Sequence, residues 1–361
     1  MTVRVLIAAG GTGGHFYPGL AVLDALRART EVVPMFIGIA RGIEARVVPT
    51  LGYPLTLLDI SALNGVRGTK LVSALAKLPR ASYAAFRTLR TFRPDVVLSV
   101  GGYTAGPVCA AAIASRVPLA VIEPNAFPGL THRIVGRFVS RAFLTYDEAA
   151  PYFARGTTRV FGSPVRRSFL DRAGLASDDR ADVPHVLVIG GSQGARAMNQ
   201  LIPGAVALAH RAGARFTITH QTGNADRESV VAAYASHGID AEVTAFIDDV
   251  ASAMSRADLL IARAGAGTVA ELGVIGRPAV FIPLPTAADD HQTKNAQAVA
   301  ARGAGLCLPQ RELSEEKLAD TLGALVRDRD GLRAMAARAR ELGRPDAADR
   351  VAEEILGLVG G

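Results

Sequence analysis

Glycine-rich turns occur three times in the chain, each between a short apolar run and a helical pattern. The first, Gly10-Gly11-Thr12-Gly13-Gly14-His15, packs four glycines around one threonine. Glycine lets the backbone approach a ligand closely, and the amides at a helix N-terminus favour negative charge. The segment therefore predicts contact with a phosphate or a sugar. A tight strand-to-helix turn without a ligand stays open as the alternative.

His15 ends the first turn and is a candidate for proton transfer. An imidazole titrates near neutral pH, so it could take a proton from an attacking hydroxyl. A role in capping the helix or in binding a phosphate fits its position equally well. The residues alone leave both interpretations open.

The two later turns also suit a phosphate-bearing ligand. Residues 190–195, Gly-Gly-Ser-Gln-Gly-Ala, offer the hydroxyl of Ser192 and several amides to a diphosphate. Residues 263–268, Arg-Ala-Gly-Ala-Gly-Thr, open a helix with amides that suit a phosphate. Glu271 follows one helical turn later and could accept both hydroxyls of a ribose, or interact only with the helix dipole. None of the turns has the spacing GxGxxG or GxxxxGK[ST], so we predict neither NAD nor a P-loop nucleotide, and no cofactor.

Polar residues also follow other predicted strands. Glu123 and Asn125 come directly after an apolar run, and Arg166, in Gly-Ser-Pro-Val-Arg, could neutralise a diphosphate. Residues 289–295, Asp-Asp-His-Gln-Thr-Lys-Asn, could bond sugar hydroxyls, or could simply begin a surface helix. No carboxylate pair or His/Cys cluster has metal-ligand spacing, so no metal site is predicted.

The elements that must position these residues alternate between short apolar runs and helical patterns, which is typical of buried parallel sheets. The fold class is α/β, with two doubly wound Rossmann-like domains that face a central cleft. We expect a first domain at 1–163 and a second at 164–342, with the hinge at 162–168. A C-terminal helix at about 343–361 should pack back on the first domain. Ligands of such sheets bind beyond the carboxyl ends of the strands, which predicts a site in the cleft.

The apolar runs predict strands, and the helical patterns between them predict helices. The strands are 3–8, 32–37, 55–59, 96–99, 119–122 and 142–145, and then 185–189, 215–219, 242–245, 259–262, 279–282 and 305–308. The helices of the first half are 17–29, 43–51, 71–92, 105–115 and 129–138, and three more fill residues 313–358.

Composition narrows the class of protein. The 361 residues are 49% hydrophobic and carry a net charge of +7, which favours anionic partners such as phosphorylated ligands or a membrane surface. No nucleic-acid-binding motif is present, so nucleic acid is not an expected partner. The two cysteines are far apart, no apolar stretch is long enough to cross a membrane, and the N-terminal run is too short for a signal peptide. These features predict a soluble cytoplasmic chain.

An ordered set of motifs along the chain resembles a known family. The motifs are residues 10–15 (GGTGGH), 101–103 (GGY), 162–166 (GSPVR), 190–196 (GGSQGAR), 246–249 (FIDD) and 290–296 (DHQTKNA). Together they are similar to the MurG family, the N-acetylglucosaminyltransferases of bacterial peptidoglycan synthesis, over nearly the whole chain. The family's common His-Glu-Gln-Asn is here Ile-Glu-Pro-Asn, at 122–125.

The resemblance implies the two-domain GT-B fold and a metal-independent reaction. It implies transfer of N-acetylglucosamine (GlcNAc) from UDP-GlcNAc to the 4-hydroxyl of undecaprenyl-diphospho-N-acetylmuramoyl-pentapeptide, which converts lipid I to lipid II with inversion. A base, His15 or Glu123, would take the acceptor's proton. The implied substrate-binding residues are Thr12, Gly13, Gly14, Asn125, Arg166, Ser192, Ile247 (through its backbone, to uracil), Ala266, Gly267, Thr268, Glu271 (to ribose) and Gln292, with His291 beside it.

A lipid-linked acceptor implies a peripheral position on the cytoplasmic face of the inner membrane, with anionic lipid as a partner. Segment 67–93 mixes basic and apolar residues, as a helix lying on an anionic leaflet does. An ordinary amphipathic core helix with a solvated basic face has the same pattern.

Three other functions remain as alternatives. A diacylglycerol galactosyltransferase and a UDP-GlcNAc 2-epimerase are enzymes of the same fold, and the epimerase would need no acceptor. A regulator that binds a nucleotide sugar without turnover would release no UDP with any acceptor.

Overall fold

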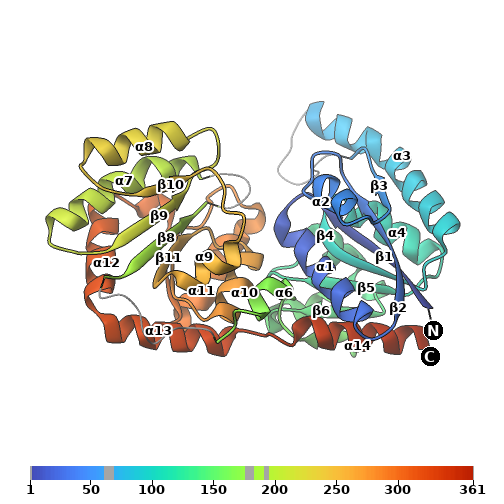
Figure 1. Cartoon of the computed structure of the whole chain (residues 1–361). Helices are drawn as coiled ribbons and strands as arrows, with labels where there is room; N and C mark the ends of the chain where they lie inside the picture. Colours follow the sequence, from blue (N-terminus) through green and yellow to red (C-terminus); the bar gives the residue numbers. More distant parts are fainter. Residues whose placement is uncertain (1, 61–68, 175–182, 191–194, 361) are drawn as a thin grey trace. The chain divides into compact units, whose positions relative to one another are not determined.

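The computed structural model describes residues 2–60, 69–174, 183–190 and 195–360, with the backbone alone at 69–75 and at 288. The chain divides into two compact units (Figure 1). Unit 1 comprises residues 1–166 and 344–361, and unit 2 comprises residues 167–343. The chain therefore passes between the units after Arg166 and again after Gly343.

The described part of unit 1 contains a parallel sheet of seven strands, in the order β3-β2-β1-β4-β5-β6-β7. Strand order reverses between β1 and β4, where a doubly wound sheet leaves a crevice for a ligand. The strands are β1 (Thr2–Gly10), β2 (Glu31–Gly38), β3 (Leu55–Leu57), β4 (Val96–Gly102), β5 (Leu119–Glu123), β6 (Arg141–Leu144) and β7 (Thr158–Val160).

Helices cover both faces of this sheet, because alternate residues of each central strand are apolar on both sides. Val5 and Ile7 of β1 face one core, and Leu6 and Ala8 face the other. The helices are α1 (Gly13–Arg27), α2 (Glu44–Thr50), α3 (Thr69–Phe92), α4 (Ala105–Ala114), α5 (Leu130–Val135) with the 3-10 turn Gly136–Phe138, and α14 (Ala347–Gly360).

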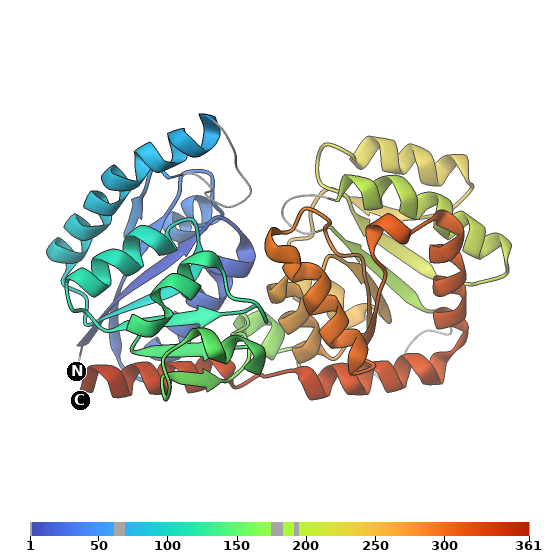
Figure 2. The same cartoon turned by 180° about the vertical axis from the view of Figure 1, so that it is seen from behind.

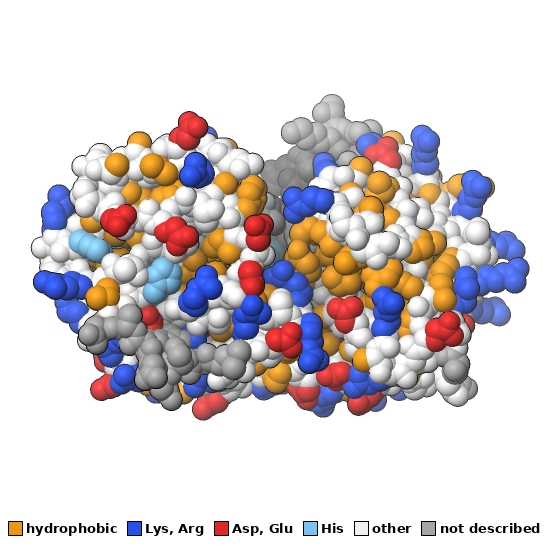
Figure 3. Space-filling view, in the orientation of Figure 1, with side chains coloured by type: hydrophobic (Ala, Val, Ile, Leu, Met, Phe, Trp, Pro, Cys, Tyr) orange, Lys and Arg blue, Asp and Glu red, His pale blue; other side chains and the backbone are white. Residues whose placement is uncertain are grey.

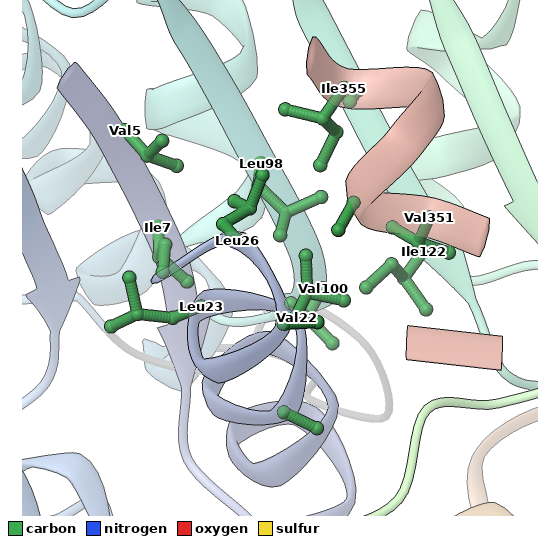
Figure 4. Close-up of a cluster of buried hydrophobic side chains, with 14 of the residues drawn as sticks. Val5, Ile7, Val22, Leu23, Leu26, Leu98, Val100, Ile122, Val351 and Ile355 are labelled. Carbon is green, nitrogen blue, oxygen red and sulfur yellow. The ribbon is translucent and has the colours of Figure 1, made fainter. Parts of the chain in front are cut away.

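The first core lies between the sheet and helices α1 and α14. Figure 4 shows side chains of β1, β4 and β5 packed against Val22, Leu23 and Leu26 of α1 and against Val351 and Ile355 of α14. The second core lies under α3, α4 and α5, which stand in front of the sheet in Figure 2. The last residues of the chain thus complete the same core as the first strand.

Unit 2 repeats the plan with six parallel strands among its described residues, in the order β10-β9-β8-β11-β12-β13. Its order reverses between β8 and β11. Helices α7, α8 and α12 pack on one face, in a core that Leu332 of α13 also joins, and α10 contacts α9, α11 and α13. The bounds are β8 (His185–Ile189), β9 (Thr217–Gln221), β10 (Glu242–Thr244), β11 (Leu259–Ala262), β12 (Ala279–Phe281), β13 (Gly305–Cys307), α6 (Arg167–Leu170), α7 (Arg196–Arg211), α8 (Arg227–Ser236), α9 (Val250–Arg256), α10 (Ala266–Ile275), α11 (His291–Ala301), α12 (Glu315–Arg327) and α13 (Arg329–Leu342).

The prediction of two doubly wound α/β domains is confirmed, and the differences are local. Strand β4 continues three residues beyond the predicted end at Ser99, because Gly101 and Gly102 still pair with Ala9 and Gly10 after a register shift. Strand β7 and helix α6 were not predicted, since elements of three or four residues carry no readable periodicity. The predicted helix at 129–138 is a short α-helix that ends in a 3-10 turn.

A buried polar cluster in unit 2 makes the fold sensitive to acid. The imidazole of His220 is fully buried and bonds the hydroxyl of Tyr234 at 3.1 Å and the Oδ1 atom of Asn199 at 3.1 Å. Burial lowers the pKa of His220 from 6.5 to about 4. Between these two values the unfolded chain binds more protons than the folded chain, so stability falls as the pH drops through this window.

We expect this histidine to cost unit 2 about 3 kcal/mol of stability at pH 4 relative to pH 7. The measurement is the free energy of unfolding in urea at several pH values for the parent chain and for His220→Gln. The variant should lose less stability than the parent between pH 6.5 and 4. Parallel curves for the two proteins would contradict the assignment.

Candidate functional site

Strands β1 and β4 end side by side at Gly10 and Gly102, at the switch point where doubly wound sheets bind their ligands. The first glycine turn leaves β1 there and enters α1, with Thr12 in extended conformation as the N-terminal cap. Gly13 and Gly14 are the first helical residues, and the helix begins with His15 N–H donating to the Thr12 carbonyl at 3.0 Å. The first amides of an α-helix have no carbonyl four residues earlier within the helix to bond, so a helix start suits an anionic ligand.

His15 is half-buried, and its ring orientation is set by β4. Its Nδ1 atom lies 3.0 Å from the carbonyl oxygen of Val100. Because a carbonyl oxygen only accepts, Nδ1 carries the proton, and Nε2 holds the lone pair of the neutral ring. The geometry therefore presents His15 as a base through Nε2.

Two glycines at the end of β4 are required by close backbone approach. Gly102 has φ +78°, and a Cβ atom there would lie 2.0 Å from the carbonyl oxygen of Gly10. Gly101 has φ +98°, and its Cβ would lie 3.2 Å from Nδ1 of His15. The pair thus lets β4 end directly against the glycine turn and against the imidazole.

Glu44 supports the same turn and was not predicted as a site residue. Its side chain is fully buried, and its carboxylate accepts hydrogen bonds from Gly11 N–H at 3.1 Å and Ile39 N–H at 2.8 Å. A Cβ atom at Gly38 or Gly42 would come within 2.2 Å of this carboxylate side chain. The spacing Gly-x-x-x-Gly-x-Glu directly after a strand is the signal that could have indicated it.

Glu123 lies at the end of β5 in a closed hydrogen-bond network. Its Oε1 accepts from Asn125 N–H at 3.1 Å and from Asn125 Nδ2 at 3.2 Å. Its Oε2 accepts from Gly129 N–H at 3.1 Å and from His132 Nδ1 at 2.9 Å. The side chain is 2% exposed. His132, like Glu44, was not predicted as a site residue.

The pKa of Glu123 is lowered. Burial by itself would raise the pKa, but the hydrogen bond and charge of His132, together with the amides of Asn125 and Gly129, overcome it. Glu123 is therefore a carboxylate that holds the turn at 123–129. Its geometry suits orienting Asn125 better than taking a proton from a ligand.

Arg166 lies in unit 1, next to the first glycine turn. Its guanidinium carbon stands 4.2 Å from the ring centre of Tyr17, two residues after His15. A Cβ atom at Gly13 would touch the same ring at 3.2 Å. A cation held over an aromatic face keeps its charge while its orientation is fixed. Arg166 is thus presented beside the turn as a candidate phosphate ligand.

The corresponding point in unit 2 is where β8 and β11 end, at Ile189 and Ala262. Ser192 follows β8 in the sequence and lies outside the described residues. The other turn is described: Gly265 caps α10, and Ala266, Gly267 and Thr268 form its first turn. Glu271 is half-buried on the same helix. Predicted phosphate and ribose ligands therefore share one helix N-terminus.

Two buried side chains fix the position of this turn. Arg263 donates to the carbonyl oxygens of Ile282 at 2.9 Å and Pro283 at 3.1 Å. Asn295, on α11, is fully buried and donates to the carbonyl oxygen of Ala264 at 3.2 Å. The start of α11 is thereby tied to the start of α10.

The remaining predicted ligands, Gln292 and Ile247, also lie in unit 2. Gln292 is the second residue of α11, and its Oε1 accepts from Leu284 N–H at 3.0 Å. Ile247 lies between β10 and α9, in the wall of a pocket of about 390 Å³. The pocket runs along β8, β9 and β10, and is also lined by His185, Leu187, Thr219, Glu242, Thr244, Phe246, Ala253 and Arg256.

Over the described part of the chain, no three or more His, Cys, Asp or Glu side chains are grouped so that they could hold a metal ion.

Comparison with known proteins places both units in one family. Residues 5–144 match the glycosyltransferase family 28 N-terminal domain, and residues 185–351 match the C-terminal domain of the same family. The chain is 43% identical, over 99% of its length and 93% of the relative's, to UDP-N-acetylglucosamine–N-acetylmuramyl-(pentapeptide) pyrophosphoryl-undecaprenol N-acetylglucosamine transferase of Myxococcus xanthus (strain DK1622).

Solved structures show the same fold. The crystal structure of Acinetobacter baumannii MurG is 31% identical, with a TM-score of 0.79 over 98% of this chain and 99% of that chain. UDP-GlcNAc 2-epimerase from Neisseria meningitidis, bound to UDP-GlcNAc, is 14% identical, with a TM-score of 0.68 over 98% of this chain and all of that chain. The second likeness concerns the fold alone.

Proposed function

The chain belongs to glycosyltransferase family 28, and from this membership we propose that it is the GlcNAc transferase that acts on pyrophosphoryl-undecaprenol-linked N-acetylmuramoyl-pentapeptide. It is an N-acetylglucosaminyltransferase of peptidoglycan synthesis, and UDP-GlcNAc is its donor. The observation that carries this conclusion is 43% identity to a transferase of that name over 99% of the chain.

The donor is assigned to unit 2. The amides of Ala266, Gly267 and Thr268 at the start of α10 provide partial positive charge for a phosphate. Glu271 is the proposed ribose ligand and Ile247 the proposed uracil ligand, through its backbone. Gln292 is the proposed ligand of the sugar hydroxyls, and it would exchange its bond to Leu284 N–H for one to the sugar.

The acceptor and the base are assigned to unit 1. Nε2 of His15 takes the proton of the acceptor's 4-hydroxyl as that oxygen bonds to the anomeric carbon of GlcNAc. The bond from the anomeric carbon to the diphosphate breaks, UDP leaves, and displacement from the opposite face inverts the centre through an oxocarbenium-like state. Thr12, Gly13 and Gly14 border the reacting groups, and Asn125 contacts the sugar.

Between the two candidate bases, the geometry favours His15. Glu123 is buried and already accepts four hydrogen bonds, so its lone pairs are committed to the turn. The charge on the departing UDP is balanced by helix-terminal amides and by Arg166. We therefore expect transfer to need no divalent cation.

The test is UDP release from UDP-GlcNAc with and without a short-chain lipid I analogue, in EDTA. Release only with the acceptor supports the transferase and excludes both the epimerase and a regulator without turnover. Donor binding without release in the presence of the acceptor would contradict the assignment. Loss of release in EDTA, restored by Mg²⁺, would overturn only the metal independence.

The lipid-linked acceptor requires the enzyme to work at the cytoplasmic surface of the cell membrane. No helix in the described residues is long and apolar enough to cross a bilayer. Leu78, Phe86, Leu89 and Phe92 of α3 pack into the core of unit 1. Arg80, Arg87 and Arg90 are exposed, as is Tyr83 at 68%. This part of the segment is thus an amphipathic core helix with a basic outer face, and Figure 3 shows Lys and Arg side chains following α3 along the margin of unit 1.

An exposed apolar stripe on the same layer supports membrane contact. Leu130, Ile134 and Phe138 recur every four residues along α5 and its 3-10 turn, with exposed fractions of 44%, 62% and 57%. Arg133 and Arg137 flank the stripe. Helix α4 packs between α3 and α5, so basic and apolar groups share one face of unit 1. An anionic leaflet attracts the first and accepts the second.

Reversing three charges of α3 tests this surface. We expect Arg80→Glu, Arg87→Glu and Arg90→Glu together to weaken flotation with anionic vesicles by about 100-fold, since each cation near the surface contributes about 1 kcal/mol. The matched control changes Arg211, Arg215 and Arg227 of unit 2 to Glu, which lowers the net charge equally. Equal losses of vesicle binding in the two triple variants would indicate an effect of net charge and would contradict membrane contact through α3.

A further inference from the structure

His132 is a buried histidine that is bonded through both ring nitrogens. It is 2% exposed, its Nδ1 lies 2.9 Å from Oε2 of Glu123, and its Nε2 lies 3.3 Å from Oγ of Ser99. A carboxylate only accepts, so Nδ1 carries a proton in either charge state. The ring therefore links the end of β5 to β4 through two side-chain hydrogen bonds.

Strand β4 connects this histidine to His15 through three successive residues. Ser99 bonds His132, and the carbonyl of Val100 accepts from His15. The position that a Cβ atom would take at Gly101 lies 3.2 Å from Nδ1 of His15 and 3.7 Å from Cε1 of His132. The two imidazoles thus lie next to the same glycine.

The other side of the network leads to Asn125. One oxygen of Glu123 holds both the backbone and the side-chain amide of Asn125, and the other oxygen holds Gly129 N–H and His132. A carboxylate is planar, so fixing Oε2 also fixes the direction in which Oε1 presents Asn125. Removing His132 would leave Oε2 with the bond from Gly129 N–H alone of these two, so the direction of the buried carboxylate would be less restrained.

We propose that His132 is a positioning residue for the transfer, which sets the turn that carries Asn125 at a fixed place relative to His15. It acts through Glu123 on one side and through Ser99 on the other, and it does not touch the substrate. The inference rests on the proposed roles of His15 and Asn125, and it adds a residue that the motifs did not indicate.

The experiment uses the full chain with His132 changed to Asn, Gln or Leu. Asparagine places an amide N–H near the former Nδ1 and keeps the bond to Glu123. Glutamine places one near the former Nε2, toward Ser99, and leucine removes both. The affinity for UDP and the midpoint of thermal unfolding show that each variant is folded.

We expect His132→Asn to keep kcat within about threefold of the parent chain, and His132→Leu to lower kcat by roughly 100-fold with little change in the KM for the donor, as for a misplacement of about 1 Å. His132→Gln should resemble the leucine variant. Equal losses in the Asn and Leu variants, or full activity of a folded leucine variant, would overturn the proposal. If the leucine variant does not fold, the comparison of Asn with Gln decides in the same way.

A second readout does not depend on activity. In histidine-labelled protein the ring nitrogen resonances of His15 are assigned by their loss in His15→Gln, among the seven histidines of the chain. They should move in His132→Leu and His132→Gln but not in His132→Asn. Unmoved signals in all three variants contradict the positioning role, whereas a parent chain without acceptor-dependent UDP release contradicts the proposed function.

Discussion

Replacing His15 by alanine is expected to lower kcat for GlcNAc transfer by about 10²–10⁴-fold, the range that general base catalysis contributes, and to leave the affinity for UDP unchanged. Nδ1 of His15 donates to the carbonyl of Val100, which leaves Nε2 as the proton acceptor. The proposed UDP ligands are Arg166 and groups of unit 2, and they do not include this ring. The substitution should therefore lower kcat without changing the affinity for UDP.

The measurement pairs steady-state UDP release with calorimetric titration of UDP. His15→Asn is the matched variant, because its side-chain amide can still donate to Val100 but offers no basic nitrogen. It should be nearly as slow as His15→Ala. If the Asn variant works well, or if turnover and UDP affinity fall together, His15 has a binding role instead of a catalytic one.

The pH dependence of kcat/KM gives a further check on the same residue. A base must be unprotonated to act, so the rate should fall as the pH drops below the pKa of the group responsible. Glu123 has a lowered pKa, which would place such a fall well below neutrality. A fall near neutral pH that disappears in the His15 variants therefore separates the two candidate bases.

The parts of the fold that follow from local pattern were predicted well. Apolar runs such as 185–189 and 259–262 coincide with β8 and β11, because a strand buried on both faces must be apolar throughout. The glycine turns at 10–14 and 265–268 were found for a related reason: close backbone approach removes side chains, and the missing side chains show in the sequence.

The groups that support the turns were not predicted, because their partners are distant in sequence. Glu44 bonds an amide 33 residues earlier, and His132 bonds a hydroxyl 33 residues earlier. His132 has no local signal that distinguishes it from a surface residue, and for Glu44 the signal is limited to the glycines at 38 and 42. These residues and their partners come together only through the order of the strands, in which β1 lies between β2 and β4.

The end of β4 explains why a short stretch of sequence has several roles. Ser99, Val100 and Gly101 contact His132 and His15, and Gly102 closes against Gly10. A strand buried among six others moves little, so side chains fixed to it keep their separation. Sheet register thus fixes the proposed catalytic groups of unit 1, and Glu44 and His132 connect the strands to the loops by hydrogen bonds.

Replacing Glu44 by alanine is expected to destabilise unit 1 by roughly 2–6 kcal/mol, because one buried and one part-buried N–H group would each lose an acceptor, at about 1–3 kcal/mol apiece. Gly11 and Ile39 are those donors. Protein that still folds should lose turnover, because the glycine turn that precedes His15 is no longer held against β2. UDP affinity should be kept, since the proposed donor ligands of unit 2 do not depend on this turn.

The measurements are unfolding in urea, UDP titration and acceptor-dependent UDP release. Glu44→Gln keeps the size and one acceptor oxygen, so we expect an intermediate loss of stability, and Glu148→Ala, at an exposed position of the same unit, is the matched control. An alanine variant as stable as Glu148→Ala would show that the buried amides find another acceptor. An alanine variant that is stable but inactive would mean that Glu44 shapes the turn for catalysis and does not stabilise the fold. The two hydrogen bonds that Glu44 accepts argue against that outcome.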